Sequence, residues 1–212
     1  MKLYFEDDQV QIFHGDIRDG LPVAAGSASA VVTSPPYNVG IDYDDHDDSL
    51  GLAAYANAMR SAAAEMARLL HDGGRCWVNV APIVTTASPW AIRVALAERW
   101  STWLLGADLW LHDQIAWVYQ RDPDTAWGSW SSPSAPNLRG AWETILVASK
   151  GPEWKRQAPA GMEGWRDTVG EWTPLTSNVW RINPNVTMTI RHRSRSSCPP
   201  GASGCRPGQV RR

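Results

Sequence analysis

The chain has 212 residues and a formal net charge of −2, a length that allows one domain with a substantial core. No apolar run reaches the length of a membrane span, and three cysteines without a secretory signal favour a reducing, cytoplasmic setting. Residues 1–171 contain 22 acidic and 13 basic residues, which excludes a general nucleic-acid binder. Any contact with DNA must therefore come from a local patch.

The first predicted element is a strand over Val10–Phe13, which His14, Gly15 and Asp16 follow. An acidic residue at the carboxyl end of a strand can accept hydrogen bonds from a ribose or an amine. Asp16 can equally cap the next segment, residues 17–21, as a turn aspartate. Both interpretations stay open.

A second short strand, Ala30–Val32, is soon followed by Pro35 and Pro36, which cannot donate to a strand ladder. Because the residue before each proline is held extended, a stiff loop is predicted at the strand's carboxyl end, where open α/β sheets bind ligands. Ser34 offers a hydroxyl there and Tyr37 a flat ring. Such a loop can hold a planar amine, with oxygens accepting its N–H bonds and the ring stacking on it. A proline-rich turn without chemistry is the alternative.

The tetrapeptide Ser34-Pro35-Pro36-Tyr37 resembles motif IV, (Asp/Asn/Ser)-Pro-Pro-(Tyr/Phe), of the DNA amino-methyltransferases. The resemblance implies a Rossmann-like α/β methyltransferase sheet with helices on both faces, S-adenosylmethionine as cofactor and double-stranded DNA as substrate. It implies catalytic roles for Ser34, Pro35, Pro36 and Tyr37 and cofactor contacts for Asp16 and Ser34. The target base would swing out of the duplex, Ser34 and the Pro35 carbonyl would accept its amino N–H bonds, and Tyr37 would stack on it. Serine at the first position favours cytosine N4 over adenine N6.

Five acids in residues 42–48 suggest calcium, but the spacing has neither a central glycine nor a final glutamate. A mobile, solvated loop is predicted instead, and the histidines show no ligand spacing, so no metal site is expected. Ser49 is predicted to cap a helix over Leu50–Leu70, whose apolar residues follow helical spacing until Asp72-Gly73-Gly74. Cys76–Val80 is predicted to be the next strand.

A second helix is predicted over Pro89–Leu104, because proline is favourable in a first helical turn. The strand Leu109–Tyr119, a loop that ends at Arg139 and the strand Trp142–Lys150 follow. These two strands resemble the hairpin that lies near the target base in the methyltransferase family, with Arg139 and Glu143 at the end of its loop. The alternative is an edge hairpin without chemistry.

The polar segment 151–176 is predicted to be a linker or a DNA-reading element, in which Lys155 and Arg156 would contact phosphates. Residues 1–182 as a whole are predicted to be the catalytic half of a methyltransferase. No glycine-rich loop of the form Phe-x-Gly-x-Gly follows, so the fold is expected to be incomplete at the C-terminus. Residues 183–212 are interpreted as disordered or as the product of a frame shift, with a basic DNA-binding arm as the alternative.

Three interpretations of function stay open: a DNA methyltransferase of the restriction–modification type, whose activity in this form is in question, a non-catalytic DNA-binding remnant of one, or a structural α/β domain. Methylation of an amino group forms no covalent adduct with the enzyme, so no catalytic cysteine is expected, and Cys76 lies on a predicted strand. The 13 tryptophans must include core residues and can include rings that stack on bases. The sequence does not sort them.

Overall fold

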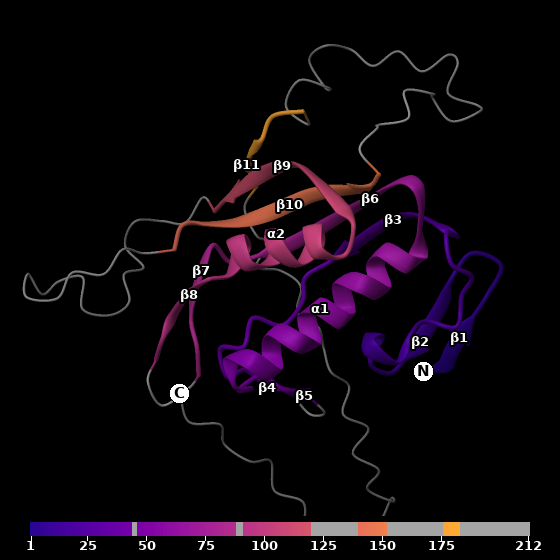
Figure 1. The fold of residues 1–212 in the computed structure, drawn as a ribbon, viewed down its shortest axis with the longest axis horizontal. Coiled ribbons are helices and arrows are strands. Elements are labelled where there is room, and N and C mark those ends of the chain that lie inside the picture. The colour runs from indigo at the N-terminus through magenta and orange to yellow at the C-terminus, as the bar shows by residue number, and fades with distance from the viewer. Residues whose placement is uncertain (44–45, 88–90, 120–139, 152–175, 183–212) are drawn as a thin grey trace, which may run out of the picture.

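The structure is a computed structural model that describes residues 1–43, 46–87, 91–119, 140–151 and 176–182. Its centre is a five-stranded mixed sheet with the strand order β11-β9-β10-β6-β3 (Figure 1). These strands are β3 (Ala28–Thr33), β6 (Leu70–Val80), β9 (Leu109–Val118), β10 (Trp142–Lys150) and β11 (Val179–Arg181). The helices are η1 (Ile17–Asp19, a 3-10 turn), α1 (Leu52–Leu69) and α2 (Leu96–Gly106). Short antiparallel pairs join β1 (Lys2–Glu6) to β2 (Gln11–His14), β4 (Asp42–Tyr43) to β5 (His46–Asp47), and β7 (Ile83–Thr85) to β8 (Arg93–Ala95).

The sheet places an antiparallel hairpin beside parallel strands. β3 runs parallel to β6, whereas β10 lies antiparallel between β6 and β9, and β11 is parallel to β9. The predicted strands of this sheet are confirmed, and the predicted hairpin is β9 with β10. Because β3 and β6 run the same way, the loops after Thr33 and Val80 leave the sheet at one edge. The antiparallel β10 begins at that same edge, since Thr144 pairs with Val80.

The core lies between the sheet and two helices on one face. Side chains alternate along β6, so Cys76 and Val78 are fully buried against the helices. The helices α1 and α2 also pack against each other, with the rings of Tyr55 and Trp103 in edge contact at 5.9 Å. Trp100 is fully buried in the same cluster. Both crossovers, β3 to β6 through α1 and β6 to β9 through α2, therefore run over this face.

The opposite face of the sheet carries no helix of the described part, whereas the resemblance implies helices on both faces. On this open face Val32 is 78% exposed. Val32, Trp77, Trp117, Ile145 and Trp180 line a cavity of about 610 Å³ there. Three of the tryptophans that the sequence could not assign to core or surface thus line a cavity on the face that none of the described helices covers.

The first helix differs from its prediction at both ends. It begins after Gly51, which makes no side-chain cap bond, and Ser49 donates to Asp47 instead of capping the helix. It ends at Leu69 rather than at the glycine pair, because Leu70 already has an extended backbone and starts β6. The helical spacing predicted the helix correctly, while the cap and stop signals were wrong.

The second helix begins later than predicted. Residues 93–95 are extended because β8 pairs with β7, and α2 starts at Leu96. Leu96 is almost fully buried, so its apolar side chain belongs to the core as the spacing indicated. Pro89, the predicted first residue, lies outside the described residues.

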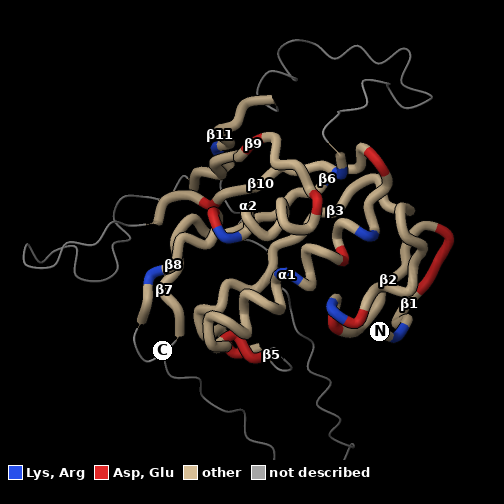
Figure 2. Tube along the Cα trace, in the orientation of Figure 1, with Lys and Arg blue, Asp and Glu red and all other residues tan. Residues whose placement is uncertain are grey.

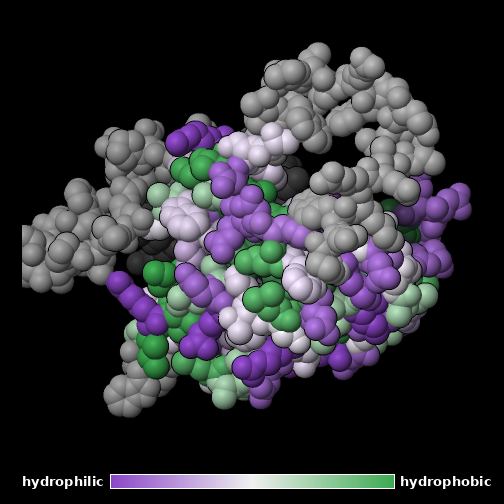
Figure 3. Space-filling model, turned by 45° about the horizontal axis from the view of Figure 1, so that its top comes forward, coloured by the Kyte–Doolittle hydropathy of each residue, from purple (hydrophilic) through white to green (hydrophobic). Residues whose placement is uncertain are grey.

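Charged side chains are dispersed over the described surface. Figure 2 shows lysines and arginines at scattered positions rather than along one face of the described part. The side seen in Figure 3 has small hydrophobic patches separated by hydrophilic residues. None of the described helices combines the length and apolar character that a membrane span needs. The described surface therefore has no broad basic stripe, in keeping with the acidic excess of residues 1–171.

A buried carboxylate holds the loop that follows β3. Asp48 is 3% exposed and accepts the backbone N–H groups of Asn38, Val39, Gly40 and Ile41 at 2.8–3.1 Å. Asn38 has a left-handed backbone with φ 61°, the kind of turn that directs successive N–H groups toward one anion. The prediction of a solvated acidic loop is therefore wrong for Asp48, whose carboxylate is structural.

Replacing Asp48 by alanine should lower the free energy of unfolding by about 3 kcal/mol, because buried backbone donors lose a charged acceptor. Urea denaturation followed by tryptophan fluorescence measures the change. Asp42→Ala removes an exposed carboxylate from the same acidic segment and should change the free energy by less than about 0.5 kcal/mol. Equal losses in the two variants would contradict the structural role of Asp48.

Candidate active site

The two prolines form a bend at the carboxyl end of β3. Thr33 is the last residue of the strand that pairs with β6, and the prolines have no N–H group with which to continue the ladder. Pro35 is buried, and the carbonyl of Pro36 accepts a hydrogen bond from the Tyr55 hydroxyl at 2.7 Å. This bond fixes the bend to α1, while Ser34 stays exposed at its start.

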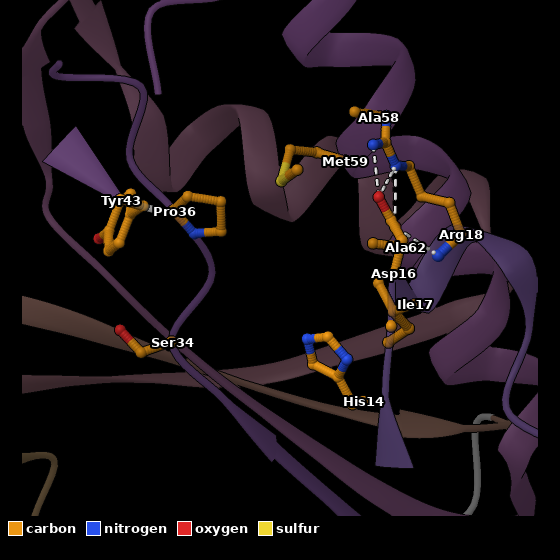
Figure 4. A pocket seen from close by; sticks show the side chains of 11 residues that line it. His14, Asp16, Ile17, Arg18, Ser34, Pro36, Tyr43, Ala58, Met59 and Ala62 are labelled. Atoms are coloured by element: carbon orange, nitrogen blue, oxygen red, sulfur yellow. Dashed lines mark hydrogen bonds and ion pairs between the residues drawn. The ribbon is translucent and has the colours of Figure 1, made fainter. Parts of the chain in front are cut away.

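Ser34 and Pro36 line a cavity of about 690 Å³, which we name the first cavity. Figure 4 shows these two residues on one side of it, Asp16 and Arg18 on the other, and Met59 of α1 between them. Its lining also includes His14, Ile17, Tyr43, Ala58 and Ala62. The motif is therefore accessible from a cavity at the edge of the sheet, and both Asp16 and Ser34 line this cavity.

Asp16 caps the segment that follows it, as one of its two interpretations predicts, while its contact with a ligand stays a prediction. It caps η1 by accepting the N–H of Arg18 at 2.8 Å, and its two carboxylate oxygens each lie 2.9 Å from Nε of Arg18. Hydrogen bonding and charge attraction from Asp16 raise the pKa of Arg18. Asp16 also lines the first cavity. Nη2 of Arg18 also donates to Oδ2, so Arg18 contacts both carboxylate oxygens, and a ligand that binds Asp16 must share these oxygens with Arg18 or displace its guanidinium group.

The hydroxyl of Tyr37 reaches a polar cluster at the ends of β6 and β10, while its ring packs against the helix-side core. Its Oη lies 3.4 Å from Oε2 of Glu143, 3.4 Å from the Asn79 carbonyl oxygen and 3.5 Å from Oγ of Ser34. Asn79 Nδ2 donates to Oε2 of Glu143 at 2.5 Å. Burial chiefly, with a further contribution from Glu143, raises the pKa of Tyr37 to about 12. The hydroxyl therefore remains neutral at physiological pH.

Ser34 also lines the cavity on the open face of the sheet, which we name the second cavity. Thr33 and Asn79 are polar residues of its lining, beside three tryptophans. Oδ1 of Asn79 is buried and has no hydrogen-bond partner in the part of the chain that is described. Ser34 thus stands between two cavities, one with charged and apolar walls and one with aromatic walls.

Sequence reasoning missed Asn79 and placed Glu143 only at the end of a hairpin loop. Strand alternation contains a signal for Asn79, since its neighbours Val78 and Val80 face the helices. The strand register then decides which residues meet: Ile145 pairs with Asn79, which brings Glu143 beside it. This register joins residues 64 positions apart, and the sequence alone does not give it.

The predicted DNA contacts Arg139, Lys155 and Arg156 lie outside the described residues. The same holds for segment 152–175 and the tail 183–212. Within the described ranges, no group of histidine, cysteine, aspartate and glutamate side chains is arranged to hold a metal ion.

Sequence comparison connects the chain to DNA methylases. The family model N6_N4_Mtase, described as DNA methylase, matches residues 28–201. The type II methyltransferase M.MjaVI of Methanocaldococcus jannaschii is 30% identical over 172 residues, which cover 80% of this chain and 84% of that protein.

Solved methylase structures share the fold. TTHA0409 from Thermus thermophilus, solved in complex with S-adenosyl-L-methionine, matches with a TM-score of 0.58 and 20% identity over 79% of this chain. PvuII DNA methyltransferase, a cytosine-N4-specific enzyme, matches with a TM-score of 0.55 and 17% identity over 78% of this chain. The matches span 66% and 54% of those two proteins, less than two thirds of their length. The described sheet and helices therefore have the α/β fold of methyltransferases.

Cys76 is fully buried between the sheet and α1, where its sulfur lies 3.9 Å from that of Met66. Burial raises the pKa of the Cys76 thiol to about 12. At neutral pH the thiol is protonated and inaccessible, so it cannot act as a nucleophile.

In a variant with Cys198 and Cys205 replaced by serine, the Cys76 thiol should react with Ellman's reagent at pH 8 at least about 100-fold more slowly in the native protein than in urea. The absorbance of the released thionitrobenzoate follows the reaction, and Cys76→Ala in the same background gives the blank. A native rate close to the rate in urea would contradict the burial of this thiol.

Proposed function

This chain belongs to the DNA methylase family, and from that premise we propose that it moves a methyl group from S-adenosylmethionine to an exocyclic amino group in double-stranded DNA. The observation that carries the proposal is the position of Ser34, which starts the diproline bend and lines both cavities. A methyl donor in one cavity and a base in the other would meet at this residue.

The first cavity fits the cofactor. Its volume of about 690 Å³ lies within the range of about 300–1,000 Å³ usual for ligand pockets. Asp16 and Ser34 provide hydrogen-bonding groups at separate places on its wall, and Met59 provides apolar surface between them. When bound, S-adenosylmethionine supplies an electrophilic methyl group on a positively charged sulfur. Asp16 would accept hydrogen bonds from the nucleoside portion of the cofactor, as acidic residues at the carboxyl ends of strands commonly do in α/β folds.

The base would approach Ser34 after leaving the duplex. The Ser34 hydroxyl and the Pro35 carbonyl would accept the two amino N–H bonds, which turns the nitrogen lone pair toward the methyl group. The carbonyl of Pro36 is already engaged by Tyr55, so it serves to hold the bend. The ring of Tyr37 packs against the core and lines neither of the two cavities, so in this geometry Tyr37 would contribute its hydroxyl beside Ser34, and stacking on the base would require the ring to turn out of the core. The rate enhancement would come from orientation and from acceptor oxygens that stabilise positive charge on nitrogen.

Cytosine N4 is the favoured target because serine at the first motif position is commoner among the cytosine-N4 enzymes of the family that the motif resembles. The similarity to a cytosine-N4-specific enzyme supports this choice at the level of fold. The chain has no glycine-rich loop of the expected form, so the described cavity residues carry the cofactor contacts in this proposal. Turnover by this chain alone is accordingly the point that the experiment must decide.

Calorimetric titration with S-adenosylmethionine and transfer of a labelled methyl group to unmethylated plasmid DNA test the proposal. Nucleoside chromatography of the digested DNA should reveal N4-methylcytosine. Retention of DNA without cofactor binding would favour a non-catalytic remnant. Absence of both would favour a structural domain and overturn the proposal.

Ser34→Ala should lower kcat by about 10- to 100-fold, because one acceptor that orients the amino group is lost. The Kd for S-adenosylmethionine should change much less, since other groups line the first cavity. Ser27→Ala, which removes an exposed hydroxyl that donates to the Ala24 carbonyl, is the matched control and should leave kcat unchanged. An unchanged kcat in Ser34→Ala would show that the hydroxyl does not hold the reacting amine.

A further inference from the structure

We propose that Glu143 is a positioning residue for the base-binding bend: through the side chains of Asn79 and Tyr37, its carboxylate fixes the tyrosine ring next to Ser34. The proposal rests on the proposed methyl transfer to DNA and adds a residue to that site. The three partners come from separate elements, the loop after β3, the end of β6 and the start of β10.

The contact between Asn79 and Glu143 is the shortest of the contacts among Asn79, Glu143 and Tyr37. Nδ2 of Asn79 donates to the carboxylate at 2.5 Å, and the pairing of β6 with β10 brings the two residues together. The reverse amide orientation would place two oxygens at this short distance and is excluded by their repulsion. Glu143 therefore decides which way the Asn79 amide points.

This orientation has an energetic consequence at Asn79. Its Oδ1 is buried without a partner among the described residues, which costs about 1–3 kcal/mol for an unsatisfied polar group. Buried groups of this kind are uncommon and call for an explanation in function or bound ligand. Asn79 also lines the second cavity together with Ser34, so the free-energy cost of this unsatisfied oxygen arises at the candidate site.

Tyr37 is held at both ends of its side chain. On the backbone side, the preceding Pro36 is bonded to Tyr55, and the following Asn38 is bonded to Asp48. On the ring side, the hydroxyl lies 3.4 Å from the carboxylate of Glu143. Because burial raises the pKa of Tyr37 to about 12, the neutral hydroxyl can donate to the carboxylate. A side chain restrained in this way keeps the bend and the neighbouring Ser34 in place, so little freedom is lost there when a base binds.

A positioning role predicts a specific pattern of activities. Glu143→Ala and Tyr37→Phe should each lower kcat/KM for DNA about tenfold, and the double variant should also lose about tenfold rather than about a hundredfold. Glu143→Gln should stay within about threefold of the unsubstituted protein, because the amide oxygen can still accept from Asn79. The KM for S-adenosylmethionine should not change. Asp113→Asn, an exposed side chain on neighbouring β9, is the control.

The contact itself can be measured without activity. Among the five tyrosines, labelled with carbon-13 at the ζ position, the Tyr37 resonance is the one that disappears in Tyr37→Phe. It should shift in Glu143→Ala and stay in place in Asp113→Asn, with thermal unfolding confirming that each variant is folded. An unmoved Tyr37 resonance overturns the proposal whatever the activity.

The kinetic outcomes separate the alternatives. Additive losses in the double variant, or a Glu143→Gln variant as poor as Glu143→Ala, would overturn positioning, and the latter would indicate that the negative charge takes part in the reaction. A fully active Glu143→Ala variant overturns it as well. If the unsubstituted protein transfers no methyl group, the proposed function fails and this role fails with it, even where the resonance shift reports the contact.

Discussion

Two adjacent prolines leave the chain after β3 without N–H donors, and the geometry of the site depends on how that deficit is met. The strand cannot continue, so groups from other elements hold the chain. Tyr55 on α1 donates to the carbonyl of Pro36, and Asp48 accepts four backbone N–H groups from the residues after Tyr37. These anchors fix a bend with few bonds of its own. A site that acts by orienting a substrate requires this kind of external support.

The direction of β10 determines which side chains surround the bend. In a sheet of parallel strands only carboxyl ends would meet at this edge. Because β10 runs antiparallel to β6, its first residues lie beside the last residues of β6 and the loop after β3. Glu143 thereby reaches Tyr37 across 106 positions of sequence and Asn79 across 64. Topology, more than local sequence, assembles this polar cluster.

The features that the sequence predicted are those with a short-range physical cause. The short apolar runs of β6 and β10 and the helical spacing of α1 identify the elements without knowledge of their neighbours, and the diproline motif marks the bend. The features it missed depend on long-range packing. Asp48 is one of five acids in residues 42–48, and nothing in this local pattern indicates that its carboxylate would bind the turn at Asn38.

Long-range packing also decides which tryptophans are buried in the core and which lie on the open face of the sheet. Trp100 of α2 lies in the closed core, whereas Trp77 of β6 lies on the open face. The difference arises because both crossovers pass over one face of the sheet, and the sequence pattern of a strand does not state which face its crossovers cover. Sorting such residues requires the arrangement of helices, which only the assembled fold provides.

The open face bears directly on the chemistry proposed for Ser34. Acceptor oxygens stabilise developing positive charge most effectively where water is excluded. The second cavity reaches from Ser34 across the face to Trp117 and Trp180, so a surface that covers these rings would also close the end next to Ser34. With this geometry, a surface that buries the apolar face would also exclude water from the Ser34 hydroxyl, where the reaction is proposed to take place.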